Sequence, residues 1–183
     1  MVLHEQEANM IRAIIFIAIS AGITLFSFRW LGDRHAHGFY RYFAFEFILA
    51  LILVNSPYWF LDPFSTLQIV SWLALGISIA LVLHGVYLLK VIGRPSGDIE
   101  NTTRLVHLGI YRYIRHPLYS SLLWFTCGAL LKQISVLTAL LAFGATLSLV
   151  LTARAEEAEN LAKFGTEYAD YMNETKRFIP LFF

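Results

Sequence analysis

Long apolar stretches alternate with short polar ones along the chain, at lengths that predict membrane-spanning helices. A spanning helix needs about 20 mostly apolar residues, because its backbone must satisfy its own hydrogen bonds within lipid. Three such stretches occupy residues 11–28, 42–60 and 64–89. The first is predicted to be a retained helix rather than a signal peptide, since Glu5 and Glu7 precede it where a signal peptide carries basic residues.

The apolar stretch from Leu118 to Ala153 is too long for one span and contains Lys132 and Gln133 near its middle. This pattern predicts a tight helical hairpin with arms at about 118–131 and 134–153, of which the first is short for a full crossing. The fold class that follows is an all-α integral membrane protein, a five-helix transmembrane bundle.

The polar tail from Arg154 to Pro180 has a helical pattern of its own. Six of its residues recur at spacings of three and four: Glu156, Glu157, Leu161, Phe164, Tyr168 and Tyr171. That spacing predicts an amphipathic helix that continues from the fifth span and packs its apolar side against the bundle.

The basic residues are distributed unevenly between the two ends of the predicted spans. Only Arg12 and Lys132 fall at one end, whereas the loops after the first and third spans and the tail hold the other twelve: Arg29, Arg34, Arg41, Lys90, Arg94, Arg104, Arg112, Arg115, Arg154, Lys163, Lys176 and Arg177. By the positive-inside rule, we expect the N-terminus outside and the C-terminal amphipathic helix in the cytoplasm.

The composition agrees with this pattern and excludes several classes of protein. Of 183 residues, 57% are hydrophobic and only 15% are charged, whereas soluble domains carry about a quarter charged residues. The single cysteine, Cys127, excludes an internal disulfide and a cysteine-based metal cluster. We find no nucleic-acid signature and no glycine-rich phosphate loop, so we expect the bilayer as partner, and neither nucleic acid nor metal.

Two polar segments at the basic end contain more charged and aromatic residues than a simple connector requires. In the first, Pro117 fits the first turn of a membrane helix, where its missing N–H has no cost. Arg115 and His116 then lie just before that helix, whose free N–H groups suit a carboxylate. In the second, Glu156 and Glu157 form an acidic pair that opposes the positive charge around it.

Each of these features also has a purely structural interpretation. Arg115 and Tyr119 would serve as interfacial anchors with His116 on the surface, and the two glutamates would pair with Arg154 and Lys163. Two polar residues fall within the spans themselves. Glu46 is expected to pair with Arg41, and His84 to form a helix-packing hydrogen bond.

Taken together and in order, the two segments resemble a known signature. It comprises Leu105-Val106, Gly109-Ile110-Tyr111, Arg115-His116-Pro117-Leu118-Tyr119, Glu156-Glu157, Phe164-Gly165, Tyr168, Tyr171 and Arg177-Phe178-Ile179-Pro180. This set is similar to that of the isoprenylcysteine carboxyl methyltransferase family and its prokaryotic relatives, which include phospholipid methyltransferases. The resemblance covers the C-terminal half of the chain and implies an enzyme of a prokaryotic inner membrane. Such an enzyme transfers a methyl group from S-adenosyl-L-methionine to a lipophilic or lipidated acceptor at the cytoplasmic membrane face.

The resemblance also implies a division of the chain and a set of site residues. Residues 1–89 would form a three-helix membrane region and residues 90–183 a catalytic region. The catalytic residues implied are Glu156, Arg154 and His116. The cofactor-binding residues implied are Thr103, Arg104, Leu105, Val106, Tyr111, His116, Pro117, Leu118, Tyr119 and Glu157.

One departure from the family pattern bears on the acceptor. The family's arginine one helical turn before the first glutamate is replaced by Thr152, and Arg154 lies about 200° further around an ideal helix. The resemblance implies carboxyl O-methylation of an isoprenylcysteine type as the leading reaction, and three alternatives stay open. These are N-methylation of a phospholipid or other amine, a non-catalytic membrane scaffold subunit, and a nicotinamide-dependent reductase of the sterol-reductase type.

Overall fold

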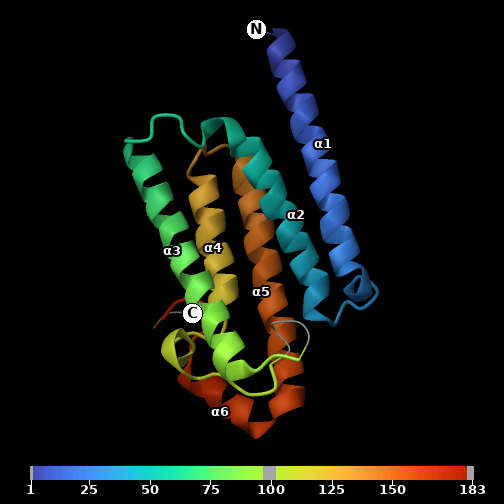
Figure 1. The fold of residues 1–183 in the computed structure, drawn as a ribbon, viewed down its shortest axis with the longest axis vertical. Coiled ribbons are helices and arrows are strands. Elements are labelled where there is room, and N and C mark those ends of the chain that lie inside the picture. Colours follow the sequence, from blue (N-terminus) through green and yellow to red (C-terminus); the bar gives the residue numbers. More distant parts are fainter. Residues whose placement is uncertain (1, 97–101, 181–183) are drawn as a thin grey trace.

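Helices form almost the whole of the structure, a computed structural model that describes residues 2–96 and 102–180 (Figure 1). Within these ranges there is no β-strand. The α-helices are α1 (Val2–Ser27), α2 (His37–Asn55), α3 (Thr66–Leu88), α4 (Pro117–Leu130), α5 (Val136–Phe164) and α6 (Thr166–Glu174). The expectation of an all-α protein is therefore confirmed.

Four helical stretches are long and apolar enough to cross a membrane: Gln6–Trp30, His37–Tyr58, Thr66–Gly93 and Val136–Phe164. They correspond to four of the five predicted spans, and they support an integral membrane protein. The remaining predicted span is α4, which is only 14 residues long. At 1.5 Å per residue it extends about 21 Å, less than the hydrocarbon thickness of a bilayer. The count of five spans is therefore not confirmed.

The interior of the bundle is built from two helix pairs, because α2 packs mainly on α5 and α3 mainly on α4. Small side chains at these contacts let the backbones approach closely. Four of them, Ala44, Ala129, Ala145 and Ala153, have no exposed surface. Hydrogen bonds across the helices add to the packing, as when the Ser71 hydroxyl donates to the Gly128 carbonyl at 2.7 Å.

Helix α1 lies at the edge of the bundle and packs on α2, diverging from it toward the N-terminus (Figure 1). Its large apolar side chains, such as Ile17 and Leu25, are mostly exposed, as expected for a surface that faces lipid. Glu46 of α2 accepts a hydrogen bond from Ser20 of α1 at 2.9 Å. The Arg41 guanidinium lies over the Trp30 ring, 4.9 Å from its centroid, and the expected pairing of Arg41 with Glu46 stays a prediction.

The tail differs from the continuous helix that the sequence predicts. Helix α5 extends through Glu156 and Glu157 to Phe164, and then Gly165 separates it from α6. Gly165 has φ +60° and ψ −131°, a conformation that only glycine adopts readily, so the chain turns there. Helix α6 consequently folds beneath the bundle, with Tyr168 and Tyr171 buried.

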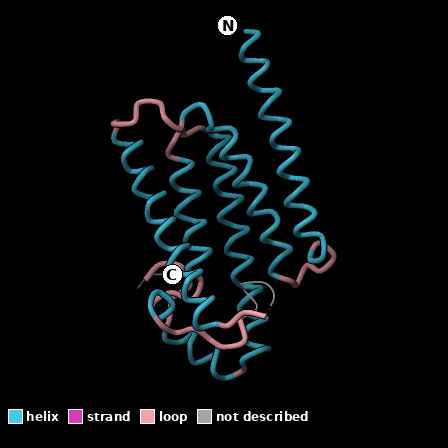
Figure 2. The backbone as a smooth tube through the Cα atoms, viewed as in Figure 1, coloured by secondary structure: helices cyan, strands magenta, loops and turns pink. Residues whose placement is uncertain are grey.

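The loops gather at the two ends of the bundle (Figure 2). One end holds the α2–α3 and α4–α5 connections. The other holds the α1–α2 connection, the described part of the long α3–α4 segment, α6 and the C-terminal segment (Figure 1). We call this second end the α6 end. It carries the sequence motifs described above.

Candidate active site

A pocket opens at the α6 end, where the α3–α4 segment, the start of α4, the last third of α5 and α6 meet. Its empty volume is about 570 Å³, counting space open to solvent. It is lined by Leu89, Thr102, Leu105, Val106, Tyr111, Arg115, His116, Pro117, Leu118, Tyr119, Glu156, Asn160, Phe164, Tyr168 and Tyr171. Residues separated by up to 82 positions in the chain are thus brought to one cavity.

The segment leading into the pocket depends on a glycine. Gly109 has φ +59°, and a Cβ there would lie 2.7 Å from both His84 Nε2 and Leu88 Cδ1 of α3. Only glycine fits this close approach without strain. The turn delivers Tyr111 to the pocket, where it is buried against Leu88 and Val106.

His116 occupies the position immediately before α4, and Pro117 begins that helix as predicted. The imidazole is only 4% exposed and stacks on the Tyr119 ring, with centroids 5.5 Å apart and planes at 24°. The backbone carbonyl of His116 accepts a hydrogen bond from the Ser120 N–H at 2.9 Å, so the first turn of α4 holds His116 in place. One face of the histidine is thereby fixed by the helix that it precedes.

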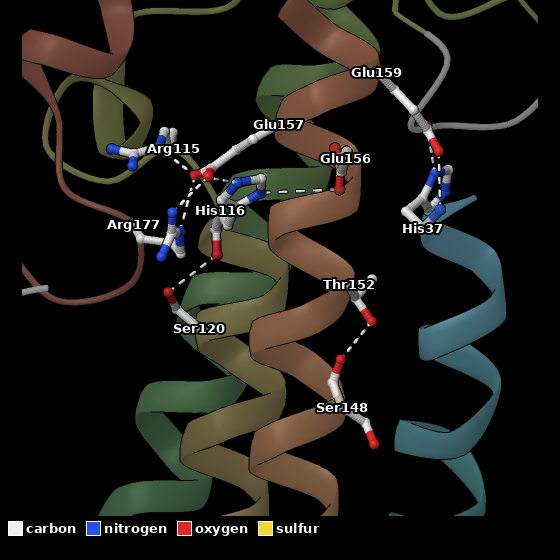
Figure 3. Close-up of polar contacts among 10 residues, drawn as sticks. All are labelled: His37, Arg115, His116, Ser120, Ser148, Thr152, Glu156, Glu157, Glu159 and Arg177. Carbon is white, nitrogen blue, oxygen red and sulfur yellow. Dashed lines mark hydrogen bonds and ion pairs between the residues drawn. The ribbon is translucent and has the colours of Figure 1, made fainter. Parts of the chain in front are cut away.

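Glu157 lies beside His116 and is the centre of a buried ionic cluster (Figure 3). Its Oε1 accepts hydrogen bonds from Nε of Arg115 at 2.6 Å and Nε of Arg177 at 3.0 Å, and it lies 3.2 Å from Nε2 of His116. Its Oε2 accepts from NH2 of Arg177 at 2.6 Å. The residue is 4% exposed, and such charge-assisted bonds are what allow a carboxylate to be buried.

The ionic cluster also shifts the pKa of Arg177, which reaches Glu157 from the C-terminal segment. Its hydrogen bonds with Glu157 raise the pKa of the Arg177 guanidinium above its usual value, against the opposing effect of burial. Arg177 is therefore a permanent cation here, as Arg115 is by its ordinary chemistry. Two positive charges face the one carboxylate of Glu157.

Residues 175–178, which we call the tail strap, bind the motif segment to the bundle. The Lys176 carbonyl accepts the Arg115 N–H at 2.9 Å, and the Lys176 N–H donates to the Tyr113 carbonyl at 3.1 Å. These bonds form a parallel bridge between Ile114 and Lys176, 62 positions apart in the chain. The Ser120 hydroxyl donates to the Phe178 carbonyl at 2.8 Å. Phe178 itself is 3% exposed and packs in the core with Tyr119 and Leu149.

Glu156 differs from its neighbour because it lines the pocket, with its carboxylate toward His116. Its Oε2 lies 3.8 Å from Nδ1 of His116, on the opposite side of the ring from Glu157 (Figure 3). The imidazole therefore stands between two carboxylates. Of the two glutamates, Glu156 is the one on the pocket wall.

Two buried tyrosines of α6, Tyr168 and Tyr171, also line the pocket. Tyr171 donates its hydroxyl to the Tyr111 carbonyl at 2.7 Å. Burial raises the pKa of the Tyr171 phenol, and burial followed by the negative charge of Glu156 raises that of Tyr168. Both phenols are neutral at physiological pH, and they present aromatic surface to the pocket.

The structure brings together eight of the twelve residues that the sequence assigned to a site. These eight line the pocket: Leu105, Val106, Tyr111, His116, Pro117, Leu118, Tyr119 and Glu156. The other four lie outside the lining. Thr103 hydrogen-bonds the carbonyls of Gly93 and Arg94, the Arg104 N–H reaches Gly93, Arg154 is exposed on α5, and Glu157 lies in the ionic cluster.

Some lining residues were not assigned from the sequence. Asn160 is one of them, although it follows Glu156 by four positions on a helix and so had to share its face. No comparable feature of the sequence indicates that Leu89 and Thr102 line the pocket. Arg115 and Arg177 were interpreted as parts of the motif, and Arg115 alternatively as an interfacial anchor. Neither was assigned to the site, because nothing in their spacing indicates Glu157 as a partner.

Thr152, which stands where the family has an arginine, lies in the interior of the protein. Thr152 is fully buried and donates its hydroxyl to the Ser148 carbonyl of the preceding turn at 2.8 Å (Figure 3). It therefore offers no cation to the pocket. In residues 2–96 and 102–180, no three His, Cys, Asp or Glu side chains form a group that could hold a metal ion.

Fold and pocket together define a helical membrane protein with one polar, aromatic-lined site at the α6 end of its spans. The family model for phospholipid methyltransferase matches residues 66–168, which is 103 of the 183 residues. The chain belongs to this family, which includes isoprenylcysteine carboxyl methyltransferase-like proteins, so the predicted family is confirmed. Comparisons with curated proteins and with solved structures gave no match.

The family match defines the protein coarsely as a membrane methyltransferase. The matched residues run from the start of α3 to the first part of α6. They include every residue that lines the pocket except Tyr171.

Proposed function

We propose that this protein transfers a methyl group from S-adenosyl-L-methionine to a lipophilic acceptor, with the pocket at the α6 end as the active site. The observation that carries the proposal is the meeting of His116, at the start of α4, with Glu156, on α5, in one cavity. The family membership supplies the reaction class. Twelve of the fourteen basic residues lie at the pocket's end, which supports a cytoplasmic location for it.

The pocket's chemistry suits the methyl donor. S-adenosylmethionine supplies an electrophilic methyl group on a sulfonium, and it carries an ammonium and a carboxylate as well. The Glu156 carboxylate would pair with the ammonium. His116 and the free N–H groups in the first turn of α4 would hold the carboxylate. Tyr111 and Tyr168 would pack on the adenine or face the sulfonium.

The residues that line the pocket would contribute positioning and exclusion of water. The S–CH₃ bond breaks as the acceptor's new bond to the methyl carbon forms, and the electron pair of the broken bond stays on sulfur as a neutral thioether. Alignment of the two reactants within a closed pocket can supply about 7–11 kcal/mol of the barrier reduction in favourable cases. The lipid-facing side of α3 and α4 would present the acceptor, and the α6 tyrosines would cover the donor.

Glu157, which the sequence assigned to the cofactor, is proposed instead as a positioning residue. Its carboxylate is bonded to Arg115, Arg177 and His116, and it lies outside the pocket lining. It would act on the donor through His116, whose imidazole it holds against Glu156. Thr103 and Arg104 would shape the segment that leads to Leu105 without contacting the donor.

A specific observation favours an amine as the acceptor over a carboxylate. Among the lining residues that the structure describes, Glu156 carries the one carboxylate, and the one guanidinium, that of Arg115, is bound to Glu157. Arg154, which the sequence offered as the partner of an acceptor carboxylate, is not in the lining. An amine must lose its proton before it attacks, so this acceptor would require a base at the pocket.

The direct test is to incubate detergent-solubilised protein with labelled S-adenosylmethionine and a membrane lipid extract, and then identify the labelled product. An N-methylated lipid would support the amine acceptor, and its formation should slow steeply as the pH falls. A methyl ester with a rate unchanged at low pH would establish carboxyl O-methylation. No labelled lipid, together with no saturable binding of S-adenosylhomocysteine, would favour the scaffold hypothesis.

A further inference from the structure

A second polar pocket lies at the other end of the bundle, between the α2–α3 and α4–α5 connections. Its empty volume is about 440 Å³, counting space open to solvent. Polar side chains supply five of its ten lining residues, namely Asp62, Ser65, Gln68, Lys132 and Gln133. These loops lie at the opposite end from α6 in Figure 1, so this pocket is separate from the candidate active site.

Lys132 is the unusual member of this pocket because it is a cation with only 4% of its surface exposed. Its ammonium donates to Gln68 Oε1 at 2.9 Å and lies 3.5 Å from the centroid of the Trp72 ring. In the described part of the chain, no carboxylate oxygen lies within ion-pair distance of it. Burial lowers the pKa of Lys132, as expected for an ammonium without a counter-ion.

The surroundings of Lys132 hold it rigidly at this place. The Gln68 amide donates to the Lys132 carbonyl at 3.3 Å and to the Tyr58 carbonyl at 3.1 Å, so the side chain joins three segments. Gln68 and Ser65 also belong to the start of α3, whose first N–H groups and positive dipole end lie at the pocket. A buried ammonium and a helix start together attract an anion.

Asp62 gives the pocket a second, opposite charge. It lines the same cavity from the α2–α3 connection and is exposed. Since it forms no ion pair with Lys132, the two charges are separated within one pocket. The matching ligand has a negative and a positive group a short distance apart.

We propose that this pocket binds the headgroup of a zwitterionic phospholipid in the leaflet away from the active site. The phosphate contacts Lys132 and the start of α3, and the ammonium contacts Asp62. The location fits, because α2 ends and α3 begins here, which is where lipid headgroups meet spanning helices. The aromatic side chains of Tyr58, Trp59 and Trp72 near Lys132 are typical of this level of the membrane.

The proposal does not rest on the enzymatic function. Because an amine lipid could also enter the candidate active site, the test is the loss of lipid binding that substitutions at this second pocket cause in the full-length, delipidated protein in detergent. The probes are short-chain phosphatidylethanolamine, phosphatidic acid with the same chains, the matching diacylglycerol, and inorganic phosphate, with bound lipid counted by native mass spectrometry. Wild-type protein should bind phosphatidylethanolamine best. Lys132→Met should weaken both phospholipids about tenfold, the value of one charge-assisted contact. Lys163→Met, at the other end of the bundle, is the matched control and should bind as wild type does.

Asp62→Asn removes the proposed contact to the headgroup's ammonium and keeps the proposed contact of Lys132 to the phosphate. It should weaken phosphatidylethanolamine and leave phosphatidic acid unchanged. It therefore decides the question even if Lys132→Met fails to fold. The proposal is overturned if Lys132→Met binds phosphatidylethanolamine as wild type does, or if Asp62→Asn leaves the preference between the two lipids unaltered. It is also overturned if diacylglycerol or inorganic phosphate binds as well as phosphatidylethanolamine.

Discussion

Glu157 of α5 accepts a hydrogen bond from Nε of Arg115 at 2.6 Å, and this contact joins a helix to a loop 42 positions earlier in the chain. It fixes the residue that precedes His116, so the geometry of the pocket depends on it. Arg177 completes the arrangement from the C-terminal side. Three separate segments thereby meet on one buried carboxylate.

Glu157→Gln should destabilise the protein by about 3 kcal/mol, because Arg115 and Arg177 would lose their counter-ion in a buried site. Thermal unfolding in detergent measures this effect. Glu159→Gln is the matched control on the same helix, where the carboxylate is 43% exposed and pairs with His37. An unchanged unfolding temperature for Glu157→Gln would mean that the cluster does not support the fold.

Gly109→Ala should destabilise the protein by at least about 1 kcal/mol, because φ +59° is costly for alanine and the added Cβ meets His84 and Leu88. Gly22→Ala is the control. It lies within α1 with nothing within 4 Å of an added Cβ, so it should be neutral or slightly stabilising. Comparing the unfolding temperatures of the two variants checks this, and equal effects would contradict the role given to Gly109.

Alkaline pH should weaken the packing of α6. The folded-state pKa of Tyr171 is raised above its unfolded value, so this contribution to stability is complete below about pH 10 and is lost as the pH rises toward the raised pKa. Tyr171→Phe removes the phenol together with its bond to the Tyr111 carbonyl, at a cost of about 1–2 kcal/mol at neutral pH. Unfolding measured across this pH range should decline less steeply in Tyr171→Phe, and an identical decline would contradict the assignment.

Arg154→Ala should leave methyl transfer within about twofold of wild type, since the side chain is exposed and outside the pocket lining. The measurement is the rate with labelled methyl donor and the acceptor that the lipid extract identifies. A large loss of activity would mean that Arg154 reaches the acceptor after all, as the sequence first suggested. Carboxyl O-methylation would then regain its support.

The sequence predicted the parts of this fold that depend on local chemistry. Apolar length identified the four candidate spans, and Pro117 identified the start of α4 through its missing N–H. The break at Gly165 was missed, because the amphipathic spacing continues across it and hides a turn that only backbone geometry reveals. The length of α4 was predicted closely, but its count as a membrane span is not confirmed, since apolar residues in a buried helix look the same as those in a spanning one.

The site was predicted by motif rather than by geometry, and this explains which residues were misplaced. Adjacent residues on a helix point about 100° apart, so Glu156 and Glu157 had to have different surroundings. Nothing in the sequence indicated which one would face the pocket. That choice follows from the tail strap, which brings Arg177 to Glu157 from 20 positions away. Pairings of this kind depend on tertiary structure.

The most direct test of the central claim is calorimetric binding of S-adenosylhomocysteine to the solubilised full-length protein and three variants. Wild-type protein and Lys163→Ala should show saturable binding of equal affinity. Glu156→Gln and His116→Ala should bind about 10- to 100-fold more weakly, the loss of one hydrogen bond to a charged group, while remaining folded. Absence of saturable binding to wild type, or wild-type affinity in both pocket variants, would contradict the proposal that this cavity holds the methyl donor.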